Sequence, residues 1–227
     1  MPALFQPLAL RGLTLSNRIA VAPMCQYSAV EGVAQDWHLQ HYGALAASGP
    51  GLIVLEATAV SPEGRITPRC LGLWNEAQAA ALGRLVQALK SFGSSAIGVQ
   101  LAHAGRKAAT SAPWQGGGPA EDSWATVAPS AVPFDPSWPV PTGLSPSEMA
   151  MVRDAFVEAT GRALAAGFDV VELHSAHGYL LQQFLSPLSN WRDDAYGGSL
   201  ENRMRFPLEV VTAVRAAWPE EKPLGIR

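Results

Sequence analysis

The chain has 227 residues, of which 48% are hydrophobic and 15% are charged, and its formal net charge is −3 at pH 7. This composition is typical of a compact globular protein with a sizeable core, and its 16 Lys and Arg are scattered, so we expect no nucleic-acid partner. No apolar stretch approaches the roughly 18 residues of a membrane span, and the first residues lack the pattern of a secretory signal, so we expect a cytoplasmic protein with no membrane partner.

Apolar, β-branched runs alternate along the chain with helical patterns. The predicted strands are residues 18–24, 51–60, 96–105, 168–176 and 222–227. The predicted helices are residues 37–48, 75–93, 145–167 and 199–218. The third helix begins with a capping box, Ser145 and Glu148, and ends at Gly167. Repeated alternation of strand and helix predicts a parallel sheet with helices outside it.

Two parallel folds fit this pattern, a doubly wound sheet and a (β/α)8 barrel. The least ordinary residues follow the ends of the predicted strands, where a barrel places its active site. The chain contains neither G-x-G-x-x-G after its first strand nor the G-x-x-x-x-G-K-[ST] phosphate loop. The sequence therefore favours the α/β class and a (β/α)8 TIM barrel, with residues 1–227 forming one domain that supplies about the first five strands. A barrel has eight strands, so we expect the functional molecule to be longer.

A long excursion, residues 106–144, follows the third predicted strand and is rich in Gly, Pro, Ser and Trp. A loop of this length in a compact domain is usually functional, and we expect it to form a lid. The two cysteines, Cys25 and Cys70, fit neither a disulfide framework nor a zinc pattern, and we expect both to be reduced thiols.

The sequence HSAHGY, residues 174–179, follows the fourth predicted strand. His174 and His177 lack the i, i+4 spacing of a helical zinc site, so we expect no metal. A metal-dependent barrel hydrolase that uses Glu172 and both histidines stays open as an alternative. They can also be hydrogen-bonded histidines that complete a strand end. At a barrel mouth, two imidazoles can instead donate to one oxygen and polarise a carbonyl, with Tyr179 as a proton donor beside them.

Six segments resemble the Old Yellow Enzyme family of flavin-dependent ene-reductases. They include the motifs "NRIAVAPMCQYSA", "GVQLAHAGRKA" and "HSAHGYLLQQFLSPLSNWRDDAYGGSLENR", and they cover residues 17–29, 51–67, 98–108, 128–134, 166–206 and 223–227. The chain is most similar to the bacterial branch that has a cysteine near the flavin, which includes xenobiotic reductases and NADPH dehydrogenases. The family fold is an eight-stranded α/β barrel, of which this chain resembles the first two thirds.

The resemblance implies FMN as cofactor and NADPH as reductant. It implies that hydride passes from NADPH through the flavin N5 to the activated C=C bond of an α,β-unsaturated carbonyl or nitro compound. The partner would be a small-molecule activated alkene, and the protein would be a homo-oligomer. Because the family's phosphate-binding loops follow later strands, a non-catalytic barrel fragment that serves as an assembly module is a further alternative.

The resemblance also assigns residues. Those that match contacts to the cofactor are Ala22, Pro23, Met24, Cys25, Ala57, Gln100 and Arg227. Those that match contacts to the substrate are Tyr27, His174, His177 and Tyr179. The matches to catalytic positions are Tyr179 as proton donor, the two histidines as the grip on the carbonyl, Cys25 as a modulator of the flavin potential, and Tyr27 as a second hydroxyl over the flavin. We expect the polar residues Asn190, Arg192, Asp194 and Arg203 to be structural.

Overall fold

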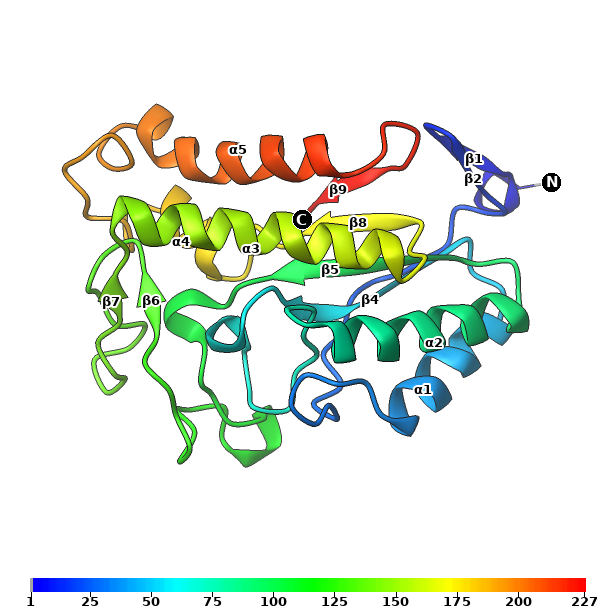
Figure 1. Ribbon diagram of the computed structural model, residues 1–227, viewed down its shortest axis with the longest axis horizontal. Coiled ribbons are helices and arrows are strands. Elements are labelled where there is room, and N and C mark those ends of the chain that lie inside the picture. Colours follow the sequence, from blue (N-terminus) through cyan, green and yellow to red (C-terminus); the bar gives the residue numbers. More distant parts are fainter. Residues whose placement is uncertain (1) are drawn as a thin grey trace.

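The computed structural model describes residues 2–227, with a parallel five-stranded sheet at its centre (Figure 1). The order of strands in the sheet is β3-β4-β5-β8-β9, which is also their order along the chain. The strands are β3 (Ala20–Val21), β4 (Leu52–Ala59), β5 (Ala96–Ala102), β8 (Val170–Leu173) and β9 (Leu224–Ile226). The helices that connect them are α1 (Asp36–Ala47), α2 (Glu76–Phe92), α3 (Pro146–Ala165) and α5 (Leu200–Ala217).

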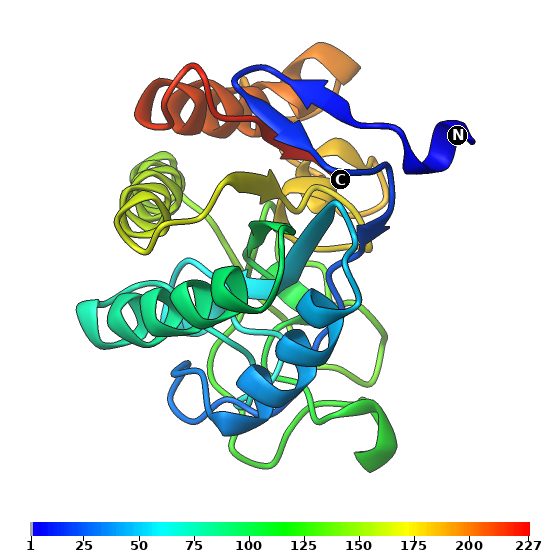
Figure 2. The same ribbon diagram turned by 90° about the vertical axis from the view of Figure 1, so that its right-hand side faces the viewer.

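The sheet is wound in one direction, because each new strand is added beside the preceding one on the same side. Parallel crossovers are right-handed, so winding without a reversal puts all the connecting helices on one face of the sheet. Figure 2 shows this outer layer of helices, with the strands inside it. A doubly wound sheet would reverse its direction and carry helices on both faces. The predicted α/β barrel is therefore confirmed as a five-stranded half barrel.

The core lies between the sheet and its helices. Alternation along the strands turns one set of side chains toward the helices and the other set toward the inside of the half barrel. The buried strand residues of this core are Ile53, Leu55, Ile97, Val99, Leu101, Val171 and Leu173. They are covered by buried helix residues that recur every three or four positions, among them Leu82, Val86, Leu89, Phe156, Ala159, Ala163, Phe206, Val210 and Val214.

Each predicted strand and helix is present, but the strands are shorter than expected. The fourth predicted strand ends at Leu173, so that residues 174–179 form the connection to a further helix, α4 (Leu180–Leu185). Neither α4 nor the N-terminal hairpin of β1 (Leu8–Leu10) and β2 (Leu13–Leu15) was expected. The hairpin lies beside the turn between α5 and β9, and the amide of Gly12 donates to the carbonyl of Glu221 at 2.8 Å (Figure 1). Its place therefore depends on a residue more than two hundred positions away.

The excursion, residues 106–144, is ordered by contacts with the rest of the fold. It contains two short paired strands, β6 (Val127–Ala128) and β7 (Thr142–Gly143), and a short 3-10 turn, Pro113–Gln115, and a second such turn, Gly105–Lys107, spans its first residues. The indole of Trp124 donates to the carbonyl of Glu63 at 2.8 Å. The excursion extends from the carboxyl ends of the strands, the end at which the candidate site lies (Figure 1).

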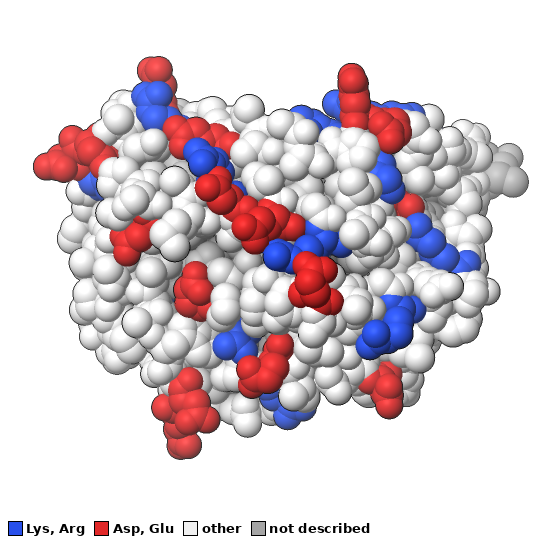
Figure 3. All heavy atoms as spheres, viewed as in Figure 1, with Lys and Arg blue, Asp and Glu red and all other residues white. Residues whose placement is uncertain are grey.

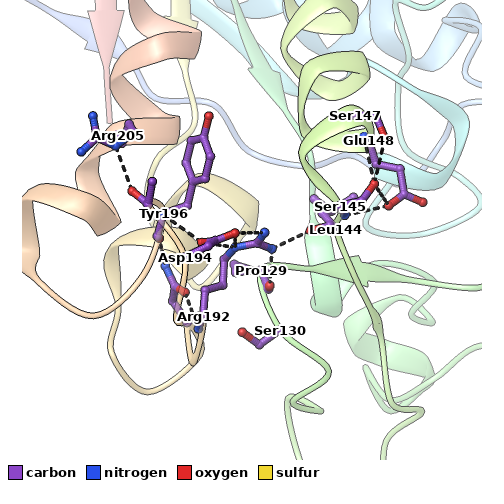
Figure 4. Close-up of polar contacts among 12 residues, drawn as sticks. Pro129, Ser130, Leu144, Ser145, Ser147, Glu148, Arg192, Asp194, Tyr196 and Arg205 are labelled. Atoms are coloured by element: carbon purple, nitrogen blue, oxygen red, sulfur yellow. Dashed lines mark hydrogen bonds and ion pairs between the residues drawn. The ribbon is translucent and has the colours of Figure 1, made fainter.

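A polar network fastens the excursion to the segment that follows α4 (Figure 4). Arg192 donates to the carbonyl of Pro129 at 2.9 Å and to that of Leu144 at 2.5 Å, and it pairs with Asp194 at 2.5 Å. Asn190 donates to the carbonyls of Phe184 and Tyr196 at 2.8 and 2.7 Å, and Arg203 donates to that of Leu185 at 2.8 Å. These contacts are structural, as we expected of the four polar residues.

On the face shown in Figure 3, acidic and basic side chains alternate instead of forming patches of one sign. Arg162, for example, lies 3.1 Å from Glu76 and 3.4 Å from Glu158. Between residues 2 and 227 no helix combines the length and the apolar character needed to cross a bilayer.

Candidate active site

The carboxyl ends of β5, β8 and β9 form a row of hydrogen-bonding side chains. Gln100 and Glu172 are register partners, and Glu172 pairs in turn with Gly225, two residues before Arg227. The amide nitrogen of Gln100 donates to Glu172 Oε1 at 2.7 Å, and Arg227 Nε donates to the same oxygen at 3.0 Å. One carboxylate oxygen therefore holds both an amide and a guanidinium in place on the inner side of the half barrel.

The segment that carries Cys25 is held by a buried carboxylate on the neighbouring strand. Glu56 lies at an irregularity in the register of β4 and is completely buried. Its Oε2 accepts a hydrogen bond from the amide of Gln26 at 2.9 Å, and its Oε1 lies 3.4 Å from both the Tyr42 hydroxyl and His38 Nε2. The Tyr42 hydroxyl also accepts from the amide of Glu56 at 2.9 Å. Because buried carboxylates are retained only where they are bonded, this cluster sets the path of the chain from Cys25 to Tyr27.

The two histidines of the HSAHGY sequence are hydrogen-bonded to each other. His174 Nε2 and His177 Nδ1 are 3.0 Å apart, and His174 Nδ1 accepts from the amide of Ala176 at 3.2 Å. Burial, followed by the charges of His177 and Arg227, lowers the pKa of His174 to about 4, so its ring is neutral near pH 7. Since Nδ1 is the acceptor, the proton of His174 is on Nε2 and is donated to His177 Nδ1. The proton of a neutral His177 is then on Nε2, on an exposed side chain that can donate it to a ligand.

Tyr179 completes this cluster. Its ring packs edge-on against that of His174 at 4.7 Å between centroids, and the ammonium of Lys107 lies 5.3 Å from the Tyr179 ring. Lys107 also donates to the carbonyl of His177 at 2.9 Å. Burial, with smaller effects from the thiols of Cys25 and Cys70, raises the pKa of Tyr179 well above its usual value. The hydroxyl is therefore protonated at neutral pH and available as a proton donor.

Tyr27 lies on the connection between β3 and α1. Its ring lies 5.2 Å from that of Trp114, which belongs to the excursion. Burial raises the pKa of Tyr27 to about 12, with a smaller effect from Cys25. Tyr27 and His177 both have positive φ values, 52° and 56°, which are uncommon for residues other than glycine. Backbone strain of this kind collects at functional sites, where the surrounding contacts enforce it.

The residues of the site are suited to the ring system of a flavin. Such a ring presents carbonyl oxygens and ring nitrogens along one edge, and these groups need hydrogen-bond donors. Gln100 and Arg227 are donors in one row, and the side chain of Arg227 is 39% exposed and accessible to a ligand. Met24, half exposed, and Cys25 lie on the connection after β3, at the same end of the sheet, and provide apolar surface there. The donor set thus fits the ring of FMN.

The sequence profile of the NADH:flavin oxidoreductase / NADH oxidase family matches residues 3–227. The chain belongs to this family. It is 46% identical over 225 residues to an NADPH dehydrogenase of Clostridium acetobutylicum, a match that covers 99% of this chain and 63% of the relative. The chain spans 55%, 63% and 62% of the lengths of three curated relatives, or about three fifths of each.

Solved structures of this flavin oxidoreductase family have the same fold. Morphinone reductase in complex with tetrahydroNAD matches with a TM-score of 0.87 and 35% identity, over 100% of this chain and 64% of the other. The Old Yellow Enzyme homologue of Zymomonas mobilis matches with a TM-score of 0.85 and 32% identity, over 99% of this chain and 63% of the other. The resemblance to the Old Yellow Enzyme family and the barrel to which the five strands correspond are thereby confirmed.

In this member of the family, the structure brings the predicted residues together in two groups. The first group consists of Gln100, which lies within β5, and of His174, His177, Tyr179 and Arg227, which follow β8 and β9. The second group follows β3 and consists of Ala22, Pro23, Met24, Cys25 and Tyr27. Ala57 is the register partner of Gln100 and links the two groups. Their roles toward cofactor and substrate stay predictions.

Three residues that the sequence analysis did not assign to the flavin site contribute to its structure. The sequence analysis considered Glu172 only as an alternative metal ligand, whereas in the structure its carboxylate accepts hydrogen bonds from Gln100 and Arg227. Among residues 2–227 no three His, Cys, Asp or Glu side chains are grouped as a metal site. Glu56 could have been noticed as the one carboxylate inside the apolar run "LIVLEATA". No sequence signal pointed to Cys70, whose buried sulfur accepts from the amide of Thr67 at 3.4 Å.

Proposed function

We propose that this chain forms the flavin-binding and substrate-binding face of an NADPH-dependent ene-reductase. The observation that carries the proposal is the convergence of the Gln100–Glu172–Arg227 row with the His174, His177 and Tyr179 cluster at one end of the half barrel. Membership of a flavin oxidoreductase family supports it, as does similarity to a relative named NADPH dehydrogenase.

Bound FMN would supply a ring that takes hydride from NADPH and passes it to the β-carbon of an activated alkene. Gln100 would donate to the pyrimidine edge of that ring, and the guanidinium of Arg227 would offset negative charge there. Glu172 keeps both donors aimed at this edge by accepting from each of them. The remaining contacts with the ring would come from Ala22, Pro23, Met24, Cys25 and Ala57.

The histidine pair would grip the carbonyl or nitro oxygen of the substrate. In the present arrangement, the free N–H is that of His177, because the N–H of His174 is donated to its neighbour. A substrate oxygen that replaces this bond would accept from both rings and be polarised by two donors. The low pKa of His174, caused mainly by burial, keeps the pair from carrying two positive charges.

Tyr179 would protonate the α-carbon of the substrate. Its hydroxyl lies beside the histidine pair and is protonated at neutral pH because burial raises its pKa. Lys107, bonded to the carbonyl of His177, would keep that residue in its strained backbone conformation. Tyr27 would present a second hydroxyl over the flavin from the connection after β3.

The test is the visible absorption spectrum of the purified chain with FMN added, followed by anaerobic NADPH and then 2-cyclohexenone. We expect a flavin spectrum that bleaches with NADPH and returns with the enone. A His174→Ala/His177→Ala double variant should still bleach, but its colour should return about 100-fold to 1,000-fold more slowly, as expected for the loss of oxyanion donors. A chain that takes up no FMN, or a double variant that reoxidises at the original rate, would contradict the proposal.

A further inference from the structure

The turn formed by the HSAHGY sequence places two successive residues in the left-handed region of backbone conformation. The φ value is 56° at His177 and 77° at Gly178. Glycine adopts this region at little steric cost, but a histidine does so only where neighbouring contacts enforce it. Because the backbone conformation sets the direction in which a side chain leaves it, the 3.0 Å bond between His177 Nδ1 and His174 Nε2 depends on these contacts. They are made by the carbonyl oxygens of the turn.

One buried side chain bonds both to this turn and to the turn after β5. Gln183, on α4, is completely buried. Its Nε2 donates to the carbonyl of Gly178 at 2.7 Å and to that of Ala104 at 3.0 Å, and its Oε1 accepts from the amide of Arg106 at 3.3 Å. Ala104 and Arg106 belong to the turn that carries Lys107. A single side-chain amide therefore joins the two turns and uses its oxygen and both of its N–H groups to do so.

The turn after β5 fits closely around this amide. Gly105 has a φ of 60°, and a Cβ atom at this position would lie 2.3 Å from Gln183 Oε1, so the amide packs directly on the backbone. The turn is itself anchored, because the amide of Ala104 donates to the carbonyl of Gly64 at 2.8 Å. The hydroxyl of Ser189 also donates to the backbone carbonyl of Gln183 at 2.8 Å. Gln183 thus ties the turn of the histidines to a fixed part of the fold.

We propose that Gln183 is a positioning residue of the candidate active site. Its amide holds His177 and Gly178 in their left-handed conformation and so keeps the imidazole of His177 in its bond with that of His174. A glutamine can serve two backbone carbonyls because it is neutral and has two N–H groups, which neither a carboxylate nor an apolar side chain has. The effect on turnover rests on the proposed function, whereas the effect on the histidines does not.

The first test is nuclear magnetic resonance of the chain without flavin, with 15N-labelled histidine, near neutral pH. The two ring-nitrogen shifts of a histidine are far apart when hydrogen bonds fix one tautomer, and they approach each other when the tautomers interconvert. We expect widely separated shifts for His174 and His177 in the unsubstituted chain. The separation should shrink in Gln183→Met, which has a similar size but no N–H group.

The control is Gln182→Met, at a partly exposed position of the same helix, which should leave the ring-nitrogen shifts of both histidines unchanged. A purely structural role of Gln183 would give a different result. The variant would then unfold at a lower urea concentration, but the folded chain would keep the separated shifts.

The second test separates the two half reactions of the chain with FMN bound. The donor row is held by Glu172, which accepts from Gln100 and Arg227, and not by Gln183. In Gln183→Met, bleaching by NADPH should therefore stay within about twofold of the original rate, whereas the colour should return with 2-cyclohexenone about tenfold to 100-fold more slowly. A chain that takes up no FMN would contradict the proposed function, but the ring-nitrogen shifts would still decide the role of Gln183.

Gly105→Ala is a second variant, because the added Cβ displaces the amide of Gln183 without removing it. It should reduce the separation of the ring-nitrogen shifts as Gln183→Met does. The proposal is overturned if both variants keep the shifts of the unsubstituted chain, or if the two half reactions slow by the same factor. It is also overturned if neither variant folds, since Gln183 would then serve the fold as a whole rather than the histidines.

Discussion

Replacing Glu56 tests the buried cluster that holds the Cys25 segment. Glu56→Ala removes a carboxylate that accepts from the amide of Gln26 at 2.9 Å and lies 3.4 Å from the Tyr42 hydroxyl and from His38 Nε2. A hydrogen bond to a charged acceptor is worth about 1.5–3 kcal/mol, and the groups left behind lose their partner in a dry environment. With the small cavity that alanine leaves, the expected loss in free energy of unfolding is about 3–5 kcal/mol.

Urea denaturation followed by tryptophan fluorescence measures this loss, and Glu121→Ala, at an exposed position, is the control, with an expected change within about 0.5 kcal/mol. Glu56→Gln retains the volume and one oxygen for the amide of Gln26, so it should lose less than Glu56→Ala. A loss below about 1 kcal/mol in Glu56→Ala would refute the reasoning, because it would mean that the carboxylate contributes no more than an exposed one.

The same variants have a second readout in the Cys25 thiol. Its hydrogen bond with Cys70 and its burial are the main causes of its raised pKa, and the charge of Glu56 adds to them. Glu56→Gln removes this charge, so the pKa of Cys25 should fall, which the pH dependence of alkylation in a Cys70→Ser background would reveal. An unchanged profile would show that the charge of Glu56 does not reach the thiol.

Three further predictions follow from the site and its supports. Burial lowers the pKa of His174 to about 4 from a usual value of 6.5, so the unfolded chain binds more protons than the folded chain between these values. The contribution of His174 to the free energy of unfolding should therefore be fully present above about pH 6.5 and fall by about 3 kcal/mol on going to pH 4. Urea titrations at both pH values would measure this loss, and a His174→Gln variant should not show it. Glu172→Ala should weaken FMN binding about tenfold or more in a fluorescence titration, since Gln100 and Arg227 lose their common acceptor, and an unchanged Kd would count against the donor row. Arg192→Ala should lower the free energy of unfolding by about 2–4 kcal/mol, because its guanidinium donates to two backbone carbonyls. The control is Arg153→Ala, which removes an ion pair with the exposed Asp154 and should lower the free energy of unfolding by at most about 1 kcal/mol. Equal losses in the two variants would contradict the role of the Arg192 network.

The fold was predictable to the extent that it depends on periodicity and local signals. Apolar runs marked the five parallel strands, and the capping box of Ser145 and Glu148 marked the start of α3, which the structure reproduces with mutual hydrogen bonds. The elements that were missed, the hairpin of β1 and β2 and the helix α4, are three to six residues long in each segment. Segments this short are stable only through their neighbours, so their own sequence carries a weak signal.

The site was predictable as a set of residues but not as a set of bonds. The sequence and its resemblance to the family placed His174, His177 and Tyr179 at one end of the sheet, and the structure gathers them there. It did not follow from the sequence that the proton of His174 is donated to His177, since this depends on the amide of Ala176 reaching the other ring nitrogen. Such an assignment requires positions known to within about 0.5 Å.

By itself, the amino-acid sequence determined the class of fold, the order of its main elements and the chemical groups available at the carboxyl ends of the strands. These properties are local, because they depend on the spacing of apolar residues and on caps only a few positions apart. The tertiary structure decided which of those groups meet: that Glu172 accepts from both Gln100 and Arg227, and that Glu56 accepts from the amide of Gln26. Those contacts join segments that are tens of residues apart, and only the packing of helices against the sheet brings them within hydrogen-bonding distance.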